Sequence, residues 1–409
     1  MKKIKLMMIA LVAMIGLNSC SKDCDHDFIE HDYTNELVGT WSVIGPDHAD
    51  ALVIKADGTI EYTGFDQGEL YEGTARFELS NNRMTVIWDD GTIDEGRLNV
   101  VAGNVFSMII DEETGAGFYF TYCHEDFSDE LIGSWLLQTD ITSEIHSYYA
   151  DGTSDCLAYY YHLEEQYETF VTGTYKLVGD ILFDTVTYAE DAVYSFASRI
   201  SYTPNGSSFG DILTIKSYGL NEEEELEEYV DKIVRVKQSL DLAGNKYNYS
   251  DCQITNVKGD DIDIDFMGYT FNFAKMDGSG LDLMLKTLFF NVEFSDDNTL
   301  YYSYKLNNNK ETYNAPIVVE DNKMTIKMSD KVSTLKDVVL YTFQSVDCSQ
   351  LHMCMDKTAF VNFYTNMQAM LMDATDDQFD ITNAESVNAI YNNINSAVET
   401  IKLNIVMEK

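Results

Sequence analysis

The sequence has little positive charge. Its 27 lysines and arginines stand against 69 aspartates and glutamates, which gives a formal net charge of −42. Such a chain repels nucleic acid phosphates and anionic lipid headgroups, because like charges cost free energy on approach. We therefore expect no nucleic-acid partner. The excess of acid favours solubility, and it leaves the binding of cations open.

The sequence also has few prolines and no recognisable catalytic motif. Three prolines in 409 residues exclude a proline-rich stalk, while 45% hydrophobic and 12% aromatic residues indicate a globular chain. No nucleophile elbow, phosphate loop or paired zinc-ligand motif is present. The glycines at the start of "GAGFYF" open a predicted strand, so no helix N-terminus is there to hold a phosphate. The sequence thus predicts no enzyme, no catalytic residue, no cofactor and no metal.

Long apolar runs are missing except near the N-terminus. The run from Leu6 to Leu17 follows three lysines and precedes Asn18-Ser19-Cys20, which is typical of a secretory signal. The run is too short to span a bilayer comfortably. "LNSC" resembles the lipobox of bacterial lipoproteins, which implies that residues 1–19 are removed and that Cys20 carries the lipid. An ordinary cleaved signal remains the alternative.

The segment after Cys20 is acidic and begins with Ser21. "SKDCDHD" resembles the export tag of surface lipoproteins in Bacteroidota, which implies an outer-membrane, lipid-anchored protein, with the cell surface as one option. We expect residues 20–34 to form an acidic tether. Its His26 and His31 lie near Cys24, but a flexible linker loses entropy when it binds a metal, so we predict no metal site there.

Six cysteines follow Cys20, and their spacing fits no disulfide framework that can be read from the sequence. We expect most of these thiols to be small buried apolar groups.

Two short sequence motifs recur along the chain. Gly39-Thr40-Trp41 matches Gly133-Ser134-Trp135, and each is followed by Ala-Asp-Gly-Thr, at 56–59 and at 150–153. Asp-Gly between alternating apolar residues predicts a hairpin, because glycine accepts positive φ. Asn81-Asn82 and Gly179-Asp180 mark the next turns. Strand, hairpin, strand and hairpin make an antiparallel meander.

A third copy is weaker and carries helices. Leu242, Gly244 and Tyr247 open it, and Asp297-Asn298-Thr299 and Asp321-Asn322 mark its hairpins. Helical spacing predicts three helices: a short one containing the leucines at 281, 285 and 288, one in "DKTAFVNFYTNMQAMLM" with Asp356 or Thr358 as a possible cap, and one over 384–396. "IKLNIVME" alternates as a closing strand.

These motifs resemble the lipocalin-like domains of Bacteroidota lipoproteins, with the third copy similar to a helix-decorated calycin-like relative. The resemblance implies a mainly β protein of tandem antiparallel meander barrels. We expect barrels over 35–124, 129–238 and 240–409, the last with inserted helices. In lipocalins the opening Trp closes one end of the barrel and an Arg of the last strand packs across it. The resemblance therefore implies barrel-closing roles for Gly39, Trp41, Gly133, Trp135 and Arg235. Copies one and three offer no such Arg.

Consecutive tyrosines are the remaining clue to function. Neighbours on a strand face opposite sides, so some rings of each run should reach solvent and could stack on a sugar or protein partner. The candidates are Tyr148, Tyr149, Tyr159, Tyr160, Tyr161, Tyr301 and Tyr302. Packing against loops or a neighbouring barrel is the alternative. The acidic stretches "GDDIDIDF" and "NEEEELEEY" are interpreted as a solvated strand face and a charged hairpin tip.

Together these patterns predict a lipid-anchored, non-enzymatic binding or interaction module. Its partners would be the membrane, through the anchor, and a glycan or a protein. The alternative is a carrier of a small hydrophobic ligand in a barrel lumen.

Overall fold

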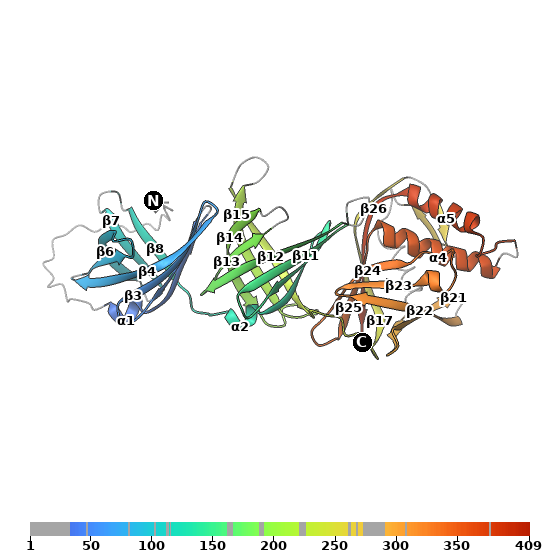
Figure 1. Ribbon diagram of the computed structural model, residues 1–409, viewed down its shortest axis with the longest axis horizontal. Helices are drawn as coiled ribbons and strands as arrows, with labels where there is room; N and C mark the ends of the chain where they lie inside the picture. The colour runs from blue at the N-terminus through green and yellow to red at the C-terminus, as the bar shows by residue number, and fades with distance from the viewer. Residues whose placement is uncertain are drawn as a thin grey trace, which may run out of the picture. The chain divides into compact units, whose positions relative to one another are not determined.

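A computed structural model gives the fold of the chain (Figure 1). It describes residues 33–45, 48–80, 82–101, 104–111, 114, 116–161, 167–187, 192–220, 226–260, 263–266, 269–272, 291–306, 309–375 and 378–409. These residues form three closed antiparallel barrels of eight strands each. The predicted mainly β class, with tandem meander barrels and helices in the C-terminal one, is confirmed.

The first two barrels run in chain order, each after a short helix. Helix α1 (Thr34–Leu37) leads into β1 (Gly39–Ile44), β2 (His48–Ile54), β3 (Thr59–Asp66), β4 (Glu69–Ser80), β5 (Arg83–Trp88), β6 (Ile93–Val101), β7 (Val105–Asp111) and β8 (Ala116–Tyr122). Helix α2 (Ser128–Leu131) leads into β9 (Gly133–Gln138), β10 (Thr142–Tyr148), β11 (Thr153–Tyr160), β12 (Tyr167–Val178), β13 (Ile181–Thr187), β14 (Val193–Thr203), β15 (Ile212–Leu220) and β16 (Leu226–Val236).

The third barrel is interrupted after its first strand by a separate hairpin. Its strands are β17 (Lys246–Gly259), β20 (Asn291–Phe294), β21 (Thr299–Leu306), β22 (Asn309–Glu320), β23 (Lys323–Ile326), β24 (Val338–Gln344), β25 (Gln350–Met355) and β26 (Val398–Glu408). The separate hairpin is β18 (Asp263–Phe266) with β19 (Tyr269–Asn272). The short 3-10 helix η3 (Met328–Asp330) and helices α4 (Lys357–Thr375) and α5 (Ala384–Ala397) complete the domain. The predicted helix around the leucines at 281, 285 and 288 lies outside the described residues.

The turns lie where the sequence places them. Gly58, Gly152 and Gly179 have φ of 84°, 82° and 62°, a region that costs glycine little. Asn82, Asn298 and Asp321 have φ between 51° and 60°, and asparagine and aspartate tolerate that region better than most residues. Each of these residues joins two strands that pair directly, so the hairpin pattern sets the order of the meander.

An aromatic ring on the first strand closes each of the first two barrels in the same way. Trp41 and Trp135 are fully buried. Each indole Nε1 donates to the carbonyl oxygen four residues earlier, at 2.7 Å for Leu37 and 2.8 Å for Leu131. The short helices α1 and α2 therefore turn their last carbonyls toward the indoles, which satisfies a buried donor that would otherwise cost stability.

In each of these two barrels a side chain of the last strand packs across the tryptophan ring, and the residue type differs between them. Arg235 lies opposite Trp135 and places its Cζ 4.3 Å from the ring centroid. In the first barrel Tyr122 takes that position, with ring centroids 5.0 Å from Trp41 at 76°. The first barrel thus replaces the cation over the ring with an edge-to-face aromatic contact, which explains why it needs no arginine.

The residue two positions before each tryptophan is glycine, because the side chain that packs across the tryptophan occupies the space that a Cβ would fill. A Cβ on Gly39 would lie 2.5 Å from the Tyr122 ring, and one on Gly133 would lie 2.8 Å from Arg235 Nη1. Both residues also have positive φ, 143° and 133°.

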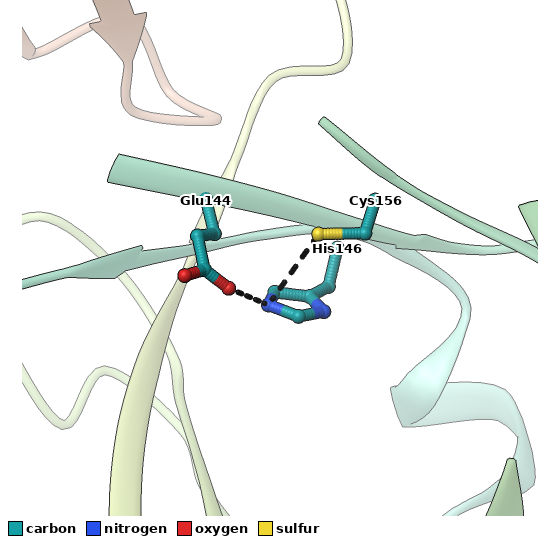
Figure 2. A group of neighbouring side chains, drawn as sticks. All are labelled: Glu144, His146 and Cys156. Carbon is teal, nitrogen blue, oxygen red and sulfur yellow. Dashed lines mark hydrogen bonds and ion pairs between the residues drawn. The ribbon is translucent and has the colours of Figure 1, made fainter. Parts of the chain in front are cut away.

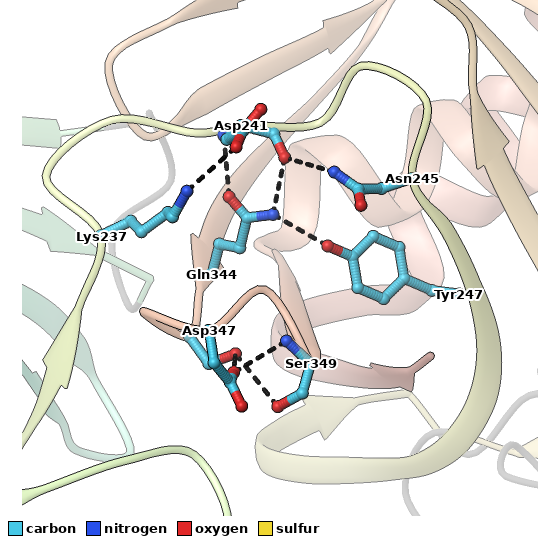
Figure 3. A network of polar contacts seen from close by, with 8 residues as sticks. Lys237, Asp241, Asn245, Tyr247, Gln344, Asp347 and Ser349 are labelled. Atoms are coloured by element: carbon cyan, nitrogen blue, oxygen red, sulfur yellow. Dashed lines mark hydrogen bonds and ion pairs between the residues drawn. The ribbon is translucent and has the colours of Figure 1, made fainter.

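In the third barrel the closing ring is Tyr247, which is fully buried. Gln344 holds it: the Gln344 Nε2 donates to the Tyr247 hydroxyl and to the Asp241 carbonyl, both at 2.8 Å, and its Oε1 accepts from the Asp241 amide at 2.7 Å (Figure 3). Asn245 and Lys237 also contact Asp241, at 2.7 and 3.1 Å. This network fixes the segment that enters β17.

Helices α4 and α5 pack beside each other on the third barrel (Figure 1). The apolar face of α4, including Phe360, Tyr364 and Met367, joins one core cluster with inward residues of the strands. The Asn383 side chain caps α5 by accepting from the Glu385 amide at 3.0 Å. The helices therefore extend the core of this barrel. Among the described residues, no helix combines the length and apolarity needed to cross a membrane.

The chain divides into two compact units. One contains the first barrel with residues 173–201 and 215–230, and the other contains residues 131–172, 202–214 and 231–409. The second barrel contributes to both units. Within the second unit, Tyr159 of β11 stacks on Tyr341 of β24, with ring centroids 4.0 Å apart.

Candidate functional site

Three ionisable side chains meet inside the second barrel, on β10 and β11. Glu144 and His146 are two residues apart on a strand and so share a face. The Asp151-Gly152 hairpin sets the register that pairs His146 with Cys156, and β9 pairs Trp135 with His146 from the other side. Directly paired residues point to the same face of a sheet. Since Trp135 is fully buried within the barrel, this face is the interior.

The side chains of this triad (Glu144, His146 and Cys156) converge on one atom, the Nε2 of His146 (Figure 2). The Glu144 Oε2 lies 3.2 Å from it and the Cys156 Sγ lies 3.9 Å from it. One ligand atom from each residue lies within 4.8 Å of the other two. The His146 and Glu144 side chains keep 27% and 25% of their surface exposed, so solvent reaches them.

The electrostatics of the triad favour positive charge at its centre. Burial by itself lowers the pKa of His146, but its hydrogen bonds to Cys156 and Glu144 outweigh burial and raise that pKa above its ordinary value. The hydrogen bond from His146 also lowers the pKa of Glu144. The carboxylate and the thiol therefore stabilise a cation between them.

The geometry does not match a nucleophilic triad. In such a triad the nucleophile contacts one imidazole nitrogen and the carboxylate orients the other nitrogen. Here the thiol and the carboxylate both approach Nε2. The arrangement instead places sulfur, nitrogen and oxygen around a common point, as metal ligands do.

Of the residues predicted from the opening motif, Gly39, Trp41, Gly133, Trp135 and Arg235 all lie at the closed ends of their barrels. Arg235 is held there by an ion pair from Nε to Asp211 Oδ2 at 3.3 Å and by Nη1 donating to the Ile132 carbonyl at 2.8 Å. Trp135 and Arg235 pair with each other directly. Trp135 also pairs with His146, so this closed end of the barrel is adjacent to the triad.

The predicted tyrosine surface is divided by the fold. Tyr148, Tyr159, Tyr161 and Tyr302 are at most 5% exposed, so they present no ring to an external partner and the expectation of exposed rings is wrong for them. Tyr148 points into the second barrel, and Tyr159 and Tyr161 pack on Tyr341. Tyr149 and Tyr160 are half-buried, and Tyr301 is 36% exposed. Tyr160 pairs with Thr142 and so shares the inner face with Glu144, whereas Tyr149 and Tyr301 remain accessible to an external partner.

The expectation that the thiols are buried apolar groups is also wrong for most of those described. Of the described cysteines, Cys354 is buried, whereas Cys123, Cys156, Cys252 and Cys348 are partly exposed. Cys20, the predicted lipid attachment site, lies outside the described residues, as do Cys24, His26 and His31.

Sequence reasoning missed the triad because Glu144 and His146 match no ligand motif. The signal was nevertheless present. A hairpin centred on Asp151 pairs His146 with Cys156, and the Glu-x-His spacing puts both ligands on one side of the strand. Comparison with protein-family models and with curated proteins finds no match for this chain.

Proposed function

We propose that this protein is a non-enzymatic binding module, attached to the outer membrane through a lipid on Cys20, and that its second barrel takes the ligand. The observation that carries this proposal is the polar, partly exposed triad inside that barrel. Ionisable groups inside a barrel reduce stability unless they are well paired, so a binding role gives a reason for their presence.

The other two barrels offer less to a ligand. Apolar side chains fill the first barrel around Trp41 and Phe106, and the third around Tyr247 and Phe294. A cavity between α4 and the strands of the third barrel, lined by residues such as Tyr302 and Met367, measures about 20 Å³. That volume holds one water molecule. The alternative function is that of a carrier for a small hydrophobic ligand. Such a carrier would also have to hold its ligand in the second barrel.

A glycan or a protein remains the candidate for an external partner. Of the tyrosines predicted to stack on such a partner, Tyr149 and Tyr301 are accessible from outside the barrels. The acidic surface, with a formal net charge of −42, favours partners that carry positive charge or none.

Attachment to the membrane is tested at Cys20. The Cys20→Ala variant should move from the membrane fraction to the soluble fraction and should lose incorporation of a radioactive fatty acid. Cys24→Ser is the matched control, since Cys24 lies four residues on and outside the lipobox, and it should stay on the membrane. Membrane association that survives in Cys20→Ala would reject the lipid anchor.

Binding inside the second barrel is tested by fluorine NMR of the full-length protein labelled with 5-fluorotryptophan. The chain has three tryptophans, and Trp135 alone lies in the second barrel, in register with His146. Trp41 and Trp88 are internal controls in the first barrel, and single Trp→Phe variants assign the signals. The probes are ZnCl₂, cis-parinaric acid and a set of monosaccharides.

We expect at least one probe to shift the Trp135 signal saturably while the other two signals stay constant. If no probe moves Trp135, or if the responses appear at Trp41 and Trp88, the second barrel is not the binding part.

A further inference from the structure

We propose that Glu144, His146 and Cys156 bind one divalent transition-metal ion of the Zn²⁺ class inside the second barrel. This inference rests on the proposed function, because it names the ligand of the same barrel.

Backbone pairing fixes all three ligands. His146 and Cys156 are opposite one another on β10 and β11, and Glu144 is the next residue on the inner face of β10. Two paired strands of a closed barrel are rigid supports, and sites on such elements are more accurately placed than sites on loops. The ligands therefore need little rearrangement to bind an ion.

The distances agree with tetrahedral coordination. Zn²⁺ lies about 2.0–2.2 Å from nitrogen and oxygen and about 2.3 Å from sulfur, so a tetrahedral ion separates N from O by about 3.3 Å and N from S by about 3.6 Å. The observed separations are 3.2 Å for His146 Nε2 to Glu144 Oε2 and 3.9 Å for Nε2 to Cys156 Sγ. The Glu144 oxygen and the Cys156 Sγ lie within 4.8 Å of each other, so the side chains must rotate to bring all three atoms onto one ion.

The charges also balance. A carboxylate, a thiolate and a neutral imidazole around a divalent ion sum to zero, so the occupied site buries no net charge. The overall charge of −42 raises the concentration of cations at the surface. Partial exposure of His146 and Glu144 lets an ion reach them.

The ligand set selects the class of metal. Sulfur and imidazole ligands favour Zn²⁺ and its neighbours in the first transition row. Ca²⁺ and Mg²⁺ prefer six or more oxygen ligands and gain little here. Three protein ligands leave a fourth position for water or for a further ligand, as in zinc sites that stay open to solvent.

The test is a titration of the full-length, reduced protein with Co²⁺, which reports its ligands through colour. A thiolate bound to Co²⁺ gives a charge-transfer band in the near ultraviolet, and tetrahedral Co²⁺ gives intense visible bands. We expect both to saturate at one Co²⁺ per chain and to disappear when Zn²⁺ is added. An excess of Ca²⁺ should leave them unchanged.

Matched variants assign the bands. Cys156→Ser should abolish the charge-transfer band, and His146→Gln should abolish tetrahedral binding. Cys348→Ser changes a partly exposed cysteine and His124→Gln an exposed histidine, both outside the second barrel, and both variants should keep the two bands. Cys24→Ser and His26→Gln should also keep them, which separates the triad from the tether. Wild-type hydrogen-exchange protection of peptides from β9 to β11 shows that the second barrel of each variant is folded.

A wild-type protein without the bands, or bands that survive in Cys156→Ser, would overturn the metal site. If Co²⁺ fails while a sugar or fatty acid still shifts the Trp135 signal, the metal inference is wrong and the proposed function stands. If neither experiment responds, both are wrong.

Discussion

Replacing Trp135 with alanine is expected to lower the stability of the second barrel by about 3–5 kcal/mol, the usual cost of deleting a buried tryptophan. The indole is fully buried and its Nε1 donates to the Leu131 carbonyl. The substitution leaves a cavity, removes the ring beneath Arg235 and leaves the last carbonyl of α2 without its buried donor. Trp41→Ala should act in the same way on the first barrel.

Trp88→Ala is the matched control. Trp88 is half-buried and donates to Asp94 at 2.6 Å, away from the closed end of its barrel, so its loss should cost less. Because the barrels need not unfold together, the measurement is hydrogen exchange with mass spectrometry, which reports each barrel separately. Peptides from β9 and β10 should lose protection in Trp135→Ala while those from β7 keep it. Equal losses in Trp135→Ala and Trp88→Ala would contradict the closing role of Trp135.

Acidification from pH 7 to pH 4 is expected to destabilise the third barrel through His352, by up to about 3 kcal/mol. Burial lowers the pKa of His352 to about 4. Its Nδ1 lies 3.1 Å from the Asn404 Nδ2, which can only donate, so the contact requires an unprotonated Nδ1. The Phe209 ring packs on the other side, with centroids 4.3 Å apart.

The direction follows from the proton balance. Between the ordinary histidine pKa of about 6.5 and the folded value of about 4, the unfolded chain binds a proton that the folded chain does not. Stability therefore falls as the pH drops through this window and levels off below it. The amide oxygen of a glutamine can also accept from Asn404 and does not titrate.

His352→Gln isolates this effect. Urea unfolding of the variant and the wild type, followed by exchange of peptides from β24 and β25, should agree near pH 7 and diverge towards pH 4, with the variant more stable. If the free energies of unfolding of the two proteins change with pH in parallel, His352 binds its proton equally well in the folded and the unfolded chain. That result would contradict the prediction.

The order of the strands could be predicted because short-range signals determine it. Asp57-Gly58, Asp151-Gly152 and Gly179 lie at tight hairpins, and each is recognisable from a few neighbouring residues. The helix expected over 384–396 agrees closely with α5 at 384–397 for a similar reason, since Asn383 and the apolar spacing are local.

The faces of the tyrosine runs could not be predicted, because they depend on contacts distant in sequence. Alternation predicts that Tyr159 and Tyr161 face the same side, opposite to Tyr160, but it does not say which side faces outward. It also does not reveal that the outer side is covered within the second unit by Tyr341 and Phe343. An outward position on a barrel strand equals exposure only when no other part of the chain packs there.

The triad could be predicted from the sequence only in part. Its strand pairing follows from a local hairpin, but three further facts decide that it forms a site: closure of the barrel, the inward direction of the face and convergence on one nitrogen. Similarly, the sequence indicated Arg235 as the cover of Trp135, whereas Tyr122 as its counterpart in the first barrel follows only from the pairing of β1 with β8.

The position of β26 between β17 and β25 has a consequence for synthesis of the chain. The first barrel can close as soon as residue 122 is available, because β8 pairs back onto β1. The third barrel stays an open sheet with two unpaired borders until residues 398–408 arrive to join strands on both sides. Contacts that span so much sequence form slowly, and open borders invite pairing with other chains. A nascent or truncated chain is thus most vulnerable to self-association in its C-terminal third, after the N-terminal part has already folded.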